Sequence, residues 1–148
     1  MKSRLTLPSI IKTIVPAIAL MLSSVGATVP VQATTSIVIT NATPAVTVDG
    51  TSGGTSRDAS CGGFVAEVPN HTIEITEDSD RKFRVKGNSN TTLLVLNSQG
   101  KRFCVQADEF SGGEAELPGR WKKGTYRVYV GSKNQGRSNY QLTILPIN

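Results

Sequence analysis

The carboxylates of this sequence that could bind a metal ion lie together in one short stretch of the chain. Asp108, Glu109 and Glu114 fall in a Gly-rich segment, and Glu116 follows two residues later. A flexible loop with several carboxylates can supply the oxygen ligands that calcium prefers. The segment nevertheless lacks the Asp-x-Asp-x-Asp-Gly spacing of a dedicated calcium loop. We therefore favour a solvated acidic loop, keep calcium at Asp108, Glu109 and Glu114 as the alternative, and expect no other cofactor.

The single histidine limits the hydrolytic chemistry that the chain could perform. His71 is the one base available to a Ser/His/Asp triad, and no Gly-x-Ser-x-Gly elbow accompanies it. It follows Pro69 and Asn70 at an expected turn, where a local hydrogen bond is the simpler role. The eleven acidic residues show no pattern that singles out a catalytic pair for glycoside cleavage. We therefore expect that the protein is not an enzyme, and a small secreted hydrolase is the least favoured function.

A cationic segment with the only tryptophan is the best candidate for a binding surface. Trp121 is followed by Lys122 and Lys123, and Tyr129 is expected to point away from the core. An exposed indole beside cations could stack on a sugar ring or bind an anionic polymer. We favour the alternative that Trp121 closes one end of the domain while the lysines stay in water, and we keep Trp121, Lys122, Lys123 and Tyr129 as the candidate binding residues. A single tryptophan without an aromatic series argues against a nucleic-acid platform.

The first 33 residues have the pattern of a secretory signal peptide. Lys2 and Arg4 precede an apolar run, and the segment Val31-Gln32-Ala33 resembles a signal-peptidase site. The uninterrupted apolar run has about 11 residues, whereas a membrane span needs roughly 20. We expect cleavage after Ala33, no membrane span afterwards, and an exported protein that is periplasmic or secreted.

Most of the net positive charge of the sequence comes from that segment. Residues 1–33 contain Lys2, Arg4 and Lys12 and no acidic residue, so their removal lowers the net charge from +5 to +2. This small excess is not what a nucleic-acid-binding protein shows. An extracellular polysaccharide or an envelope protein is the expected partner.

Both cysteines, Cys61 and Cys104, follow the signal peptide. Disulfides persist outside the cytoplasm, so we expect the two residues to be joined. A loop of this length would contribute about 4 kcal/mol in the chain-entropy model. A reactive thiol and half of a metal site are the alternatives, but neither cysteine has a histidine or a second cysteine at ligand spacing.

The remaining sequence has the period-two alternation of half-buried strands. Residues 93–96 are apolar on both faces and should form a central strand, which turns at 97–100 and returns over 101–106. Residues 79–81 are interpreted as a turn. No segment has helical spacing over three turns. Alternating strands are expected at 64–68, 73–75, 83–85, 126–130 and 140–144.

The second half of the chain resembles a known family. Residues 93–100 match its strand and hairpin, 108–114 its acidic Gly-rich loop, 124–130 its GTYRVYV-type strand and 140–144 its closing YQLTI-type strand. This pattern resembles the bacterial pre-peptidase C-terminal domain and its short stand-alone secreted relatives over residues 61–145. The resemblance implies a jelly-roll-like sandwich with no catalytic residues. Relatives often have consecutive aspartates just after the second cysteine, which this chain lacks.

These observations predict an all-β protein, an antiparallel β-sandwich with a jelly-roll-like form. We expect a signal peptide at 1–33, a flexible Ser/Thr/Gly-rich leader with short strands at 34–60, and the sandwich at 61–148. The expected function is a non-catalytic module that binds extracellular or envelope polysaccharide or protein. A structural factor of the cell envelope without a specific ligand is the alternative.

Overall fold

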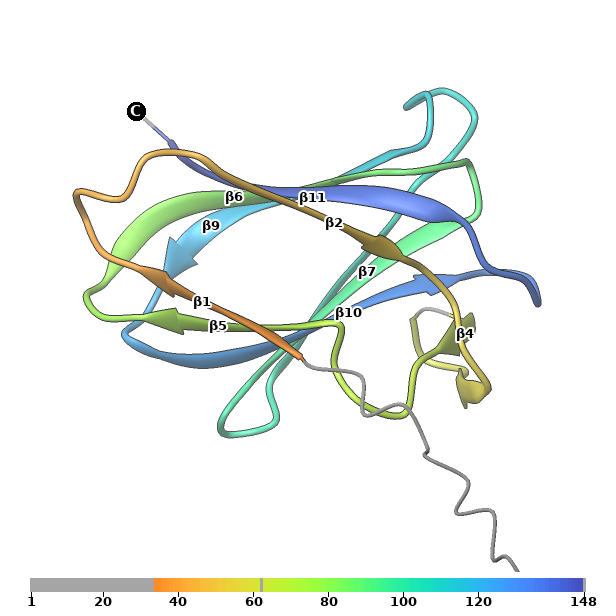
Figure 1. The fold of residues 1–148 in the computed structure, drawn as a ribbon, viewed down its shortest axis with the longest axis horizontal. Helices are drawn as coiled ribbons and strands as arrows, with labels where there is room; N and C mark the ends of the chain where they lie inside the picture. The colour runs from red at the N-terminus through yellow and green to blue at the C-terminus, as the bar shows by residue number, and fades with distance from the viewer. Residues whose placement is uncertain (1–33, 62, 148) are drawn as a thin grey trace, which may run out of the picture. The chain divides into compact units, whose positions relative to one another are not determined.

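The computed structural model describes residues 34–61 and 63–147, which form two β-sheets packed face to face (Figure 1). These residues contain strands and no helix, so the predicted all-β sandwich is confirmed. In the same part of the chain, no helix has the length and apolarity that a membrane span requires. The predicted signal peptide, 1–33, lies outside the described residues.

The first sheet, called sheet A, has seven strands. Its main path runs β1-β5-β10-β4-β3, and β7 pairs with both β10 and β8. Every pairing is antiparallel except that of β1 with β5, which is parallel. The strands are β1 (Thr35–Ile39), β3 (Ser56–Asp58), β4 (Gly63–Val65), β5 (His71–Ile75), β7 (Thr91–Asn97), β8 (Arg102–Gln106) and β10 (Gly124–Ser132).

The second sheet, called sheet B, has four strands in the order β2-β11-β6-β9, all antiparallel. Its last strand in the sequence, β11, therefore lies inside the sheet between β2 and β6. The strands are β2 (Val46–Thr51), β6 (Ser79–Lys86), β9 (Glu114–Trp121) and β11 (Asn139–Pro146).

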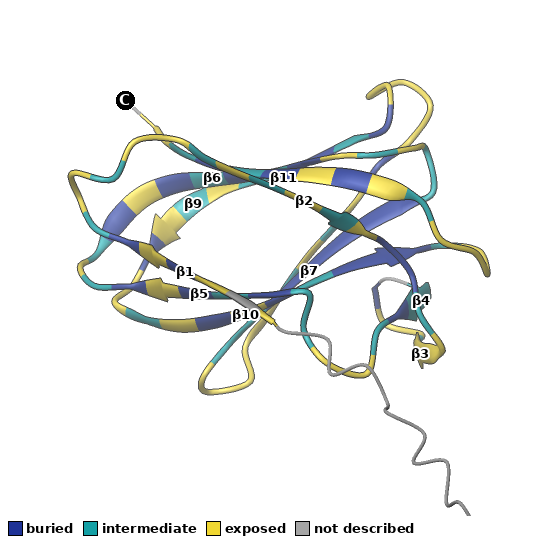
Figure 2. Ribbon diagram, in the orientation of Figure 1, coloured by how far each residue is buried: buried dark blue, intermediate teal, exposed yellow. Residues whose placement is uncertain are grey.

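The core lies between the two sheets and follows from the alternation in the sequence. Figure 2 shows buried and exposed residues taking turns along β11 and β6, because successive side chains of a strand point to opposite faces. Both sheets contribute to one buried cluster. Its largest members are Phe83, Trp121, Tyr126, Tyr140, Ile37, Ile39, Ile73, Ile75, Leu93, Leu142 and Ile144.

The segment expected to be a flexible leader belongs to the sandwich. Its short strands form, but β1 and β2 complete sheets A and B, and Ile37 and Ile39 are buried in the core. The Ser- and Gly-rich stretch after β2 is also held by hydrogen bonds to the rest of the sandwich. The Ser52 amide donates to the Ser138 carbonyl (2.8 Å), and the Gly53 amide donates to the Val130 carbonyl (3.0 Å). The sandwich thus begins at β1 and not at residue 61, because β1 pairs with β5 and β2 pairs with β11, strands that lie much later in the sequence.

Arg81 is a buried side chain that the sequence interpretation placed in a turn. It lies within β6, where it is 1% exposed and shares the inward face with Phe83 and Val85. Its guanidinium donates to the carbonyls of Thr43 (2.7 Å) and Thr40 (2.6 Å). These carbonyls belong to the connection between β1 of sheet A and β2 of sheet B, so the hydrogen bonds from Arg81 hold this connection in place.

The predicted disulfide between Cys61 and Cys104 is present, with 5.9 Å between the two Cα atoms. That separation is within the range that a disulfide requires. The bond joins the segment after β3 to β8, and Gln106 of β8 donates a hydrogen bond to the carbonyl of Cys61. The β3–β4 region is therefore attached to sheet A by a covalent link as well as by strand pairing.

Candidate functional site

Two turns at one end of the sandwich enclose a pocket of about 430 Å³. One turn joins β7 to β8 at residues 98–101, and the other joins β9 to β10 at residues 122–123. We call this hollow the basic pocket. It brings together four cationic side chains and three aromatic rings, namely Lys101, Arg120, Lys122, Lys123, Phe103, Trp121 and Tyr126.

Local hydrogen bonds fix the first of these turns. The Asn97 carboxamide oxygen accepts the amides of Gln99 (3.0 Å) and Lys101 (2.8 Å), and the Gly100 amide donates to the Asn97 carbonyl (3.0 Å). Gly100 has a φ of 78°, which glycine adopts without strain. The predicted hairpin turn is confirmed, and it holds the Lys101 side chain at the pocket.

Trp121 forms the inner wall of the basic pocket and is not an exposed platform. It is 3% exposed, its ring centroid lies 4.4 Å from that of Phe83, and its indole nitrogen donates to the Arg81 carbonyl (2.9 Å). The hypothesis of an exposed indole is therefore wrong, and the favoured interpretation, a residue that closes the end of the sandwich, is confirmed. The alternation along β9 explains this, because Trp121 lies on the same inward face as Ala115.

Phe103 provides the partly accessible ring of the pocket. It packs on Trp121 at 5.1 Å between centroids and is only half-buried. The Lys101 ammonium lies 5.2 Å from the centre of this ring, within the range of a cation–π contact. The motif interpretation missed Phe103 because its partner in this site, Trp121, is 18 positions later in the sequence.

Half of the cationic groups at the pocket are paired with acids. The Lys122 ammonium lies 2.8 Å from the Asp78 carboxylate, and the Arg120 guanidinium lies 2.9 Å from Asp80. The hydrogen bond from Lys122 lowers the pKa of Asp78. Neither Lys101 nor Lys123 forms an ion pair with a residue that the structure describes. The pocket therefore has an excess of positive charge.

Tyr129 does not join Trp121, Lys122 and Lys123. It lies on the opposite face of β10 from Tyr126 and lines a separate hollow of about 280 Å³ with Leu94. The sequence prediction of a single binding surface containing all four residues is therefore wrong in this respect. Strand alternation separates Tyr129 from the pocket.

The predicted calcium ligands do not converge. Asp108 accepts the Ser111 amide (2.6 Å), a bond that lowers the pKa of Asp108, and Glu109 is exposed. Glu114 lies at the start of β9, 3.8 Å from the Lys86 ammonium. Among residues 34–61 and 63–147, no three His, Cys, Asp or Glu side chains gather as a metal site would require.

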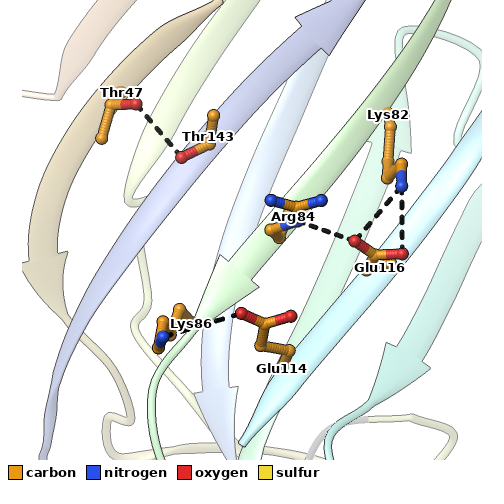
Figure 3. Close-up of polar contacts among 7 residues, drawn as sticks. All are labelled: Thr47, Lys82, Arg84, Lys86, Glu114, Glu116 and Thr143. Carbon is orange, nitrogen blue, oxygen red and sulfur yellow. Dashed lines mark hydrogen bonds and ion pairs between the residues drawn. The ribbon is translucent and has the colours of Figure 1, made fainter. Parts of the chain in front are cut away.

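The outer face of sheet B carries a row of compensated charges (Figure 3). Glu116 accepts hydrogen bonds from Arg84 (2.7 Å) and Lys82 (3.2 Å), and the bond from Arg84 lowers the pKa of Glu116. The hydroxyls of Thr47 and Thr143 lie 3.1 Å apart in the same view. Three cations face two acids here, an excess of one positive charge, whereas four cations face two acids at the basic pocket, an excess of two. This face therefore offers less attraction to an anion than the basic pocket does.

His71 is buried and makes a long-range contact, not the local hydrogen bond expected at a turn. It is 3% exposed, and its Nε2 lies 2.7 Å from the Tyr140 hydroxyl. Burial lowers the pKa of His71. Its Nδ1 has no hydrogen-bond partner among the described residues. In the described part of the chain, no carboxylate therefore accepts a hydrogen bond from His71 in the way that orients a catalytic imidazole.

No family model and no curated protein matches this sequence. Among solved structures, the pre-peptidase C-terminal domain of a collagenase from Bacillus anthracis is 16% identical, with a TM-score of 0.52, covering 76% of this chain and 97% of that one. Two periplasmic inhibitors of g-type lysozyme, PliG from Aeromonas hydrophila and from Salmonella Typhimurium, are each 14% identical with TM-scores of 0.38. They match 76% and 75% of this chain, and 98% and 97% of their own. The protein has the fold of the bacterial pre-peptidase C-terminal domain, as the sequence resemblance implied.

Proposed function

We propose that this protein is an exported, non-catalytic module that binds acidic polysaccharide outside the cytoplasm through the basic pocket. One observation carries the proposal. Lys101 lies over the half-buried ring of Phe103, and Lys123 lines the same pocket of about 430 Å³; neither lysine forms an ion pair with a described residue. An aromatic ring can pack against the apolar side of a sugar, while ammonium groups pair with its carboxylate or sulfate.

Export is supported by two independent features of the chain. The first 33 residues have the charge and apolar pattern of a signal peptide, and the Cys61–Cys104 disulfide is a bond that oxidising compartments preserve. The collagenase domain with the same fold is named as a C-terminal domain of an enzyme. A non-catalytic role fits this likeness and the isolation of His71 from a carboxylate.

Titration calorimetry with polygalacturonate tests the proposal, and neutral dextran provides the reference polymer. We expect binding to polygalacturonate that weakens as salt is added, because exposed ion pairs are screened. The double variant Lys101→Gln/Lys123→Gln should bind about 2- to 30-fold more weakly, since each of the two exposed ion pairs contributes about 0.2–1 kcal/mol.

Lys86→Gln is the matched control, because Lys86 is also an exposed lysine but lies on the outer face of sheet B. It should leave the affinity for polygalacturonate unchanged. Equal binding by the double variant and the unmodified protein would contradict the proposal. Absence of binding to any anionic polymer would favour the alternative, a structural factor of the envelope without a specific ligand.

A protein ligand is the second candidate, and the loop between β8 and β9 favours it. Phe110 is 100% exposed in this loop, although hydrogen bonds between Asp108 and Ser111 hold the backbone beneath it. A preorganised aromatic side chain is a common anchor in protein interfaces. If Phe110→Ala reduces retention of the protein in envelope fractions and the lysine double variant does not, the partner is a protein that contacts this loop.

A further inference from the structure

The edge strand β1 of sheet A differs from the other edge strands because it contains no charged residue, proline or glycine. β1 pairs through one side with β5, in parallel register from Thr35 opposite His71 to Ile39 opposite Ile75. Its other side pairs with no strand that the structure describes. An edge of this kind presents unpaired backbone amides and carbonyls to any extended segment that approaches it.

β1 contains none of the features that keep edge strands from pairing. Its sequence, Thr-Ser-Ile-Val-Ile, has no charge, no proline and no glycine, and it is rich in β-branched residues that favour strands. Ser36 and Val38 point away from the core, and Val38 is 53% exposed. The nearest charge on this outward face is Glu74, which lies on β5, one strand inside the edge.

The other edges of the two sheets are protected. β9 contains Pro118, which cannot donate a backbone hydrogen bond, and it alternates with exposed charges. β8 begins with the charged residue Arg102, β2 carries Asp49 and Gly50, and β3 is only three residues long. Short strands, charges and prolines are the features that prevent pairing between edges. β1 is the exception among these strands.

We propose that two copies of this protein pair through β1 in antiparallel orientation, so that sheet A continues from one copy into the other. With Ile37 at the centre of the pairing, Ser36 of each copy lies opposite Val38 of the other. An uncharged strand can meet its own copy without like-charge repulsion, whereas a charged edge cannot. The same strand is used by both copies, so the assembly closes as a two-fold dimer.

The dimer is expected to be weak, because a five-residue strand forms few backbone hydrogen bonds. Sedimentation velocity from low micromolar to millimolar protein should therefore show a reversible shift from monomer to dimer. The variant Val38→Lys places a charge on the edge strand without changing the core. It should shift the equilibrium toward monomer over the same range, because the two lysines would lie diagonally across the paired strands on the same outward face, where their like charges repel.

Thr47→Lys is the matched control, since Thr47 is an exposed residue of β2, the edge strand of sheet B. It should dimerise as the unmodified protein does, and circular dichroism should show that both variants fold. Amide hydrogen exchange gives a second readout. The Ile39 carbonyl accepts the Thr76 amide. By alternation, the amides of Ser36 and Val38 therefore point to the free edge, and these two should gain protection as concentration rises.

Three outcomes would overturn the proposal. The unmodified protein could stay a monomer throughout, Val38→Lys could dimerise normally, or both lysine variants could lose the dimer equally. None of these results bears on polysaccharide binding, because β1 contributes no residue to the basic pocket.

Discussion

Replacing Trp121 separates a structural role from a binding role at the basic pocket. Its indole is almost completely buried, packs against the rings of Phe83, Phe103 and Tyr126, and donates to the Arg81 carbonyl. Trp121→Ala removes all of these contacts and leaves a cavity at the end of the core. We expect this change to act on stability before it acts on any ligand.

The magnitude follows from the contacts. Truncating a buried aromatic side chain to alanine destabilises a protein by about 3–5 kcal/mol. Trp121→Phe keeps a ring but removes the indole N–H from the Arg81 carbonyl, so we expect about 1–3 kcal/mol. Since a domain is typically stable by about 5–15 kcal/mol, Trp121→Ala removes a large part of the free energy of unfolding.

Urea unfolding followed by far-ultraviolet circular dichroism measures these losses. Fluorescence is unsuitable because Trp121 is the only tryptophan. Lys123→Gln is the control at the same pocket, and as an exposed substitution it should change stability by no more than about 0.5 kcal/mol. The reasoning is refuted if Trp121→Ala loses less than about 1 kcal/mol while retention on polygalacturonate disappears.

Three further predictions concern pH, the disulfide and calcium. Burial lowers the pKa of His71 below its ordinary 6.5, so the unfolded chain binds more protons on acidification. The free energy of unfolding, measured with urea, should have its full value above pH 6.5 and should decline below it. The decline should be smaller in His71→Gln. Replacing Cys61 and Cys104 by serine should lower the free energy of unfolding by about 4 kcal/mol, because the bond closes a long loop. Thermal melts in chelator and in millimolar calcium should coincide, since Asp108 caps its own loop and Glu114 pairs with a lysine; a higher melting temperature in calcium would restore the metal hypothesis.

The strands that the sequence predicted best are those with local alternation. The faces of β10 and β11 follow directly from the spacing of Tyr126, Val128 and Val130, and of Tyr140 and Leu142, all of which are buried. The central position of β7 followed from its apolar residues on both faces, and it does lie between β10 and β8. These features need only neighbours in the sequence.

Features that depend on distant partners were not predicted. β1 belongs to the sandwich because of β5, which lies more than 30 positions later, and no local signal distinguishes a strand of a flexible leader from a strand of a sheet. Arg81 looks like a surface residue in a charged segment, since its acceptors are carbonyls about 40 positions earlier. The buried position of Trp121 was the favoured interpretation, and it also follows from continuing the alternation of β9 from Ala115.

The position of β11 determines when the protein can acquire its structure. β2 and β6 are both synthesised before β11, yet they meet only through it, because β11 separates them in sheet B. A chain that emerges from the ribosome or a translocation channel N-terminus first therefore cannot complete this sheet until residues 139–146 are free. Sheet A and the β6–β9 pair contain only strands that precede β11, so β2 is the strand that has no partner in its sheet until the C-terminal segment arrives.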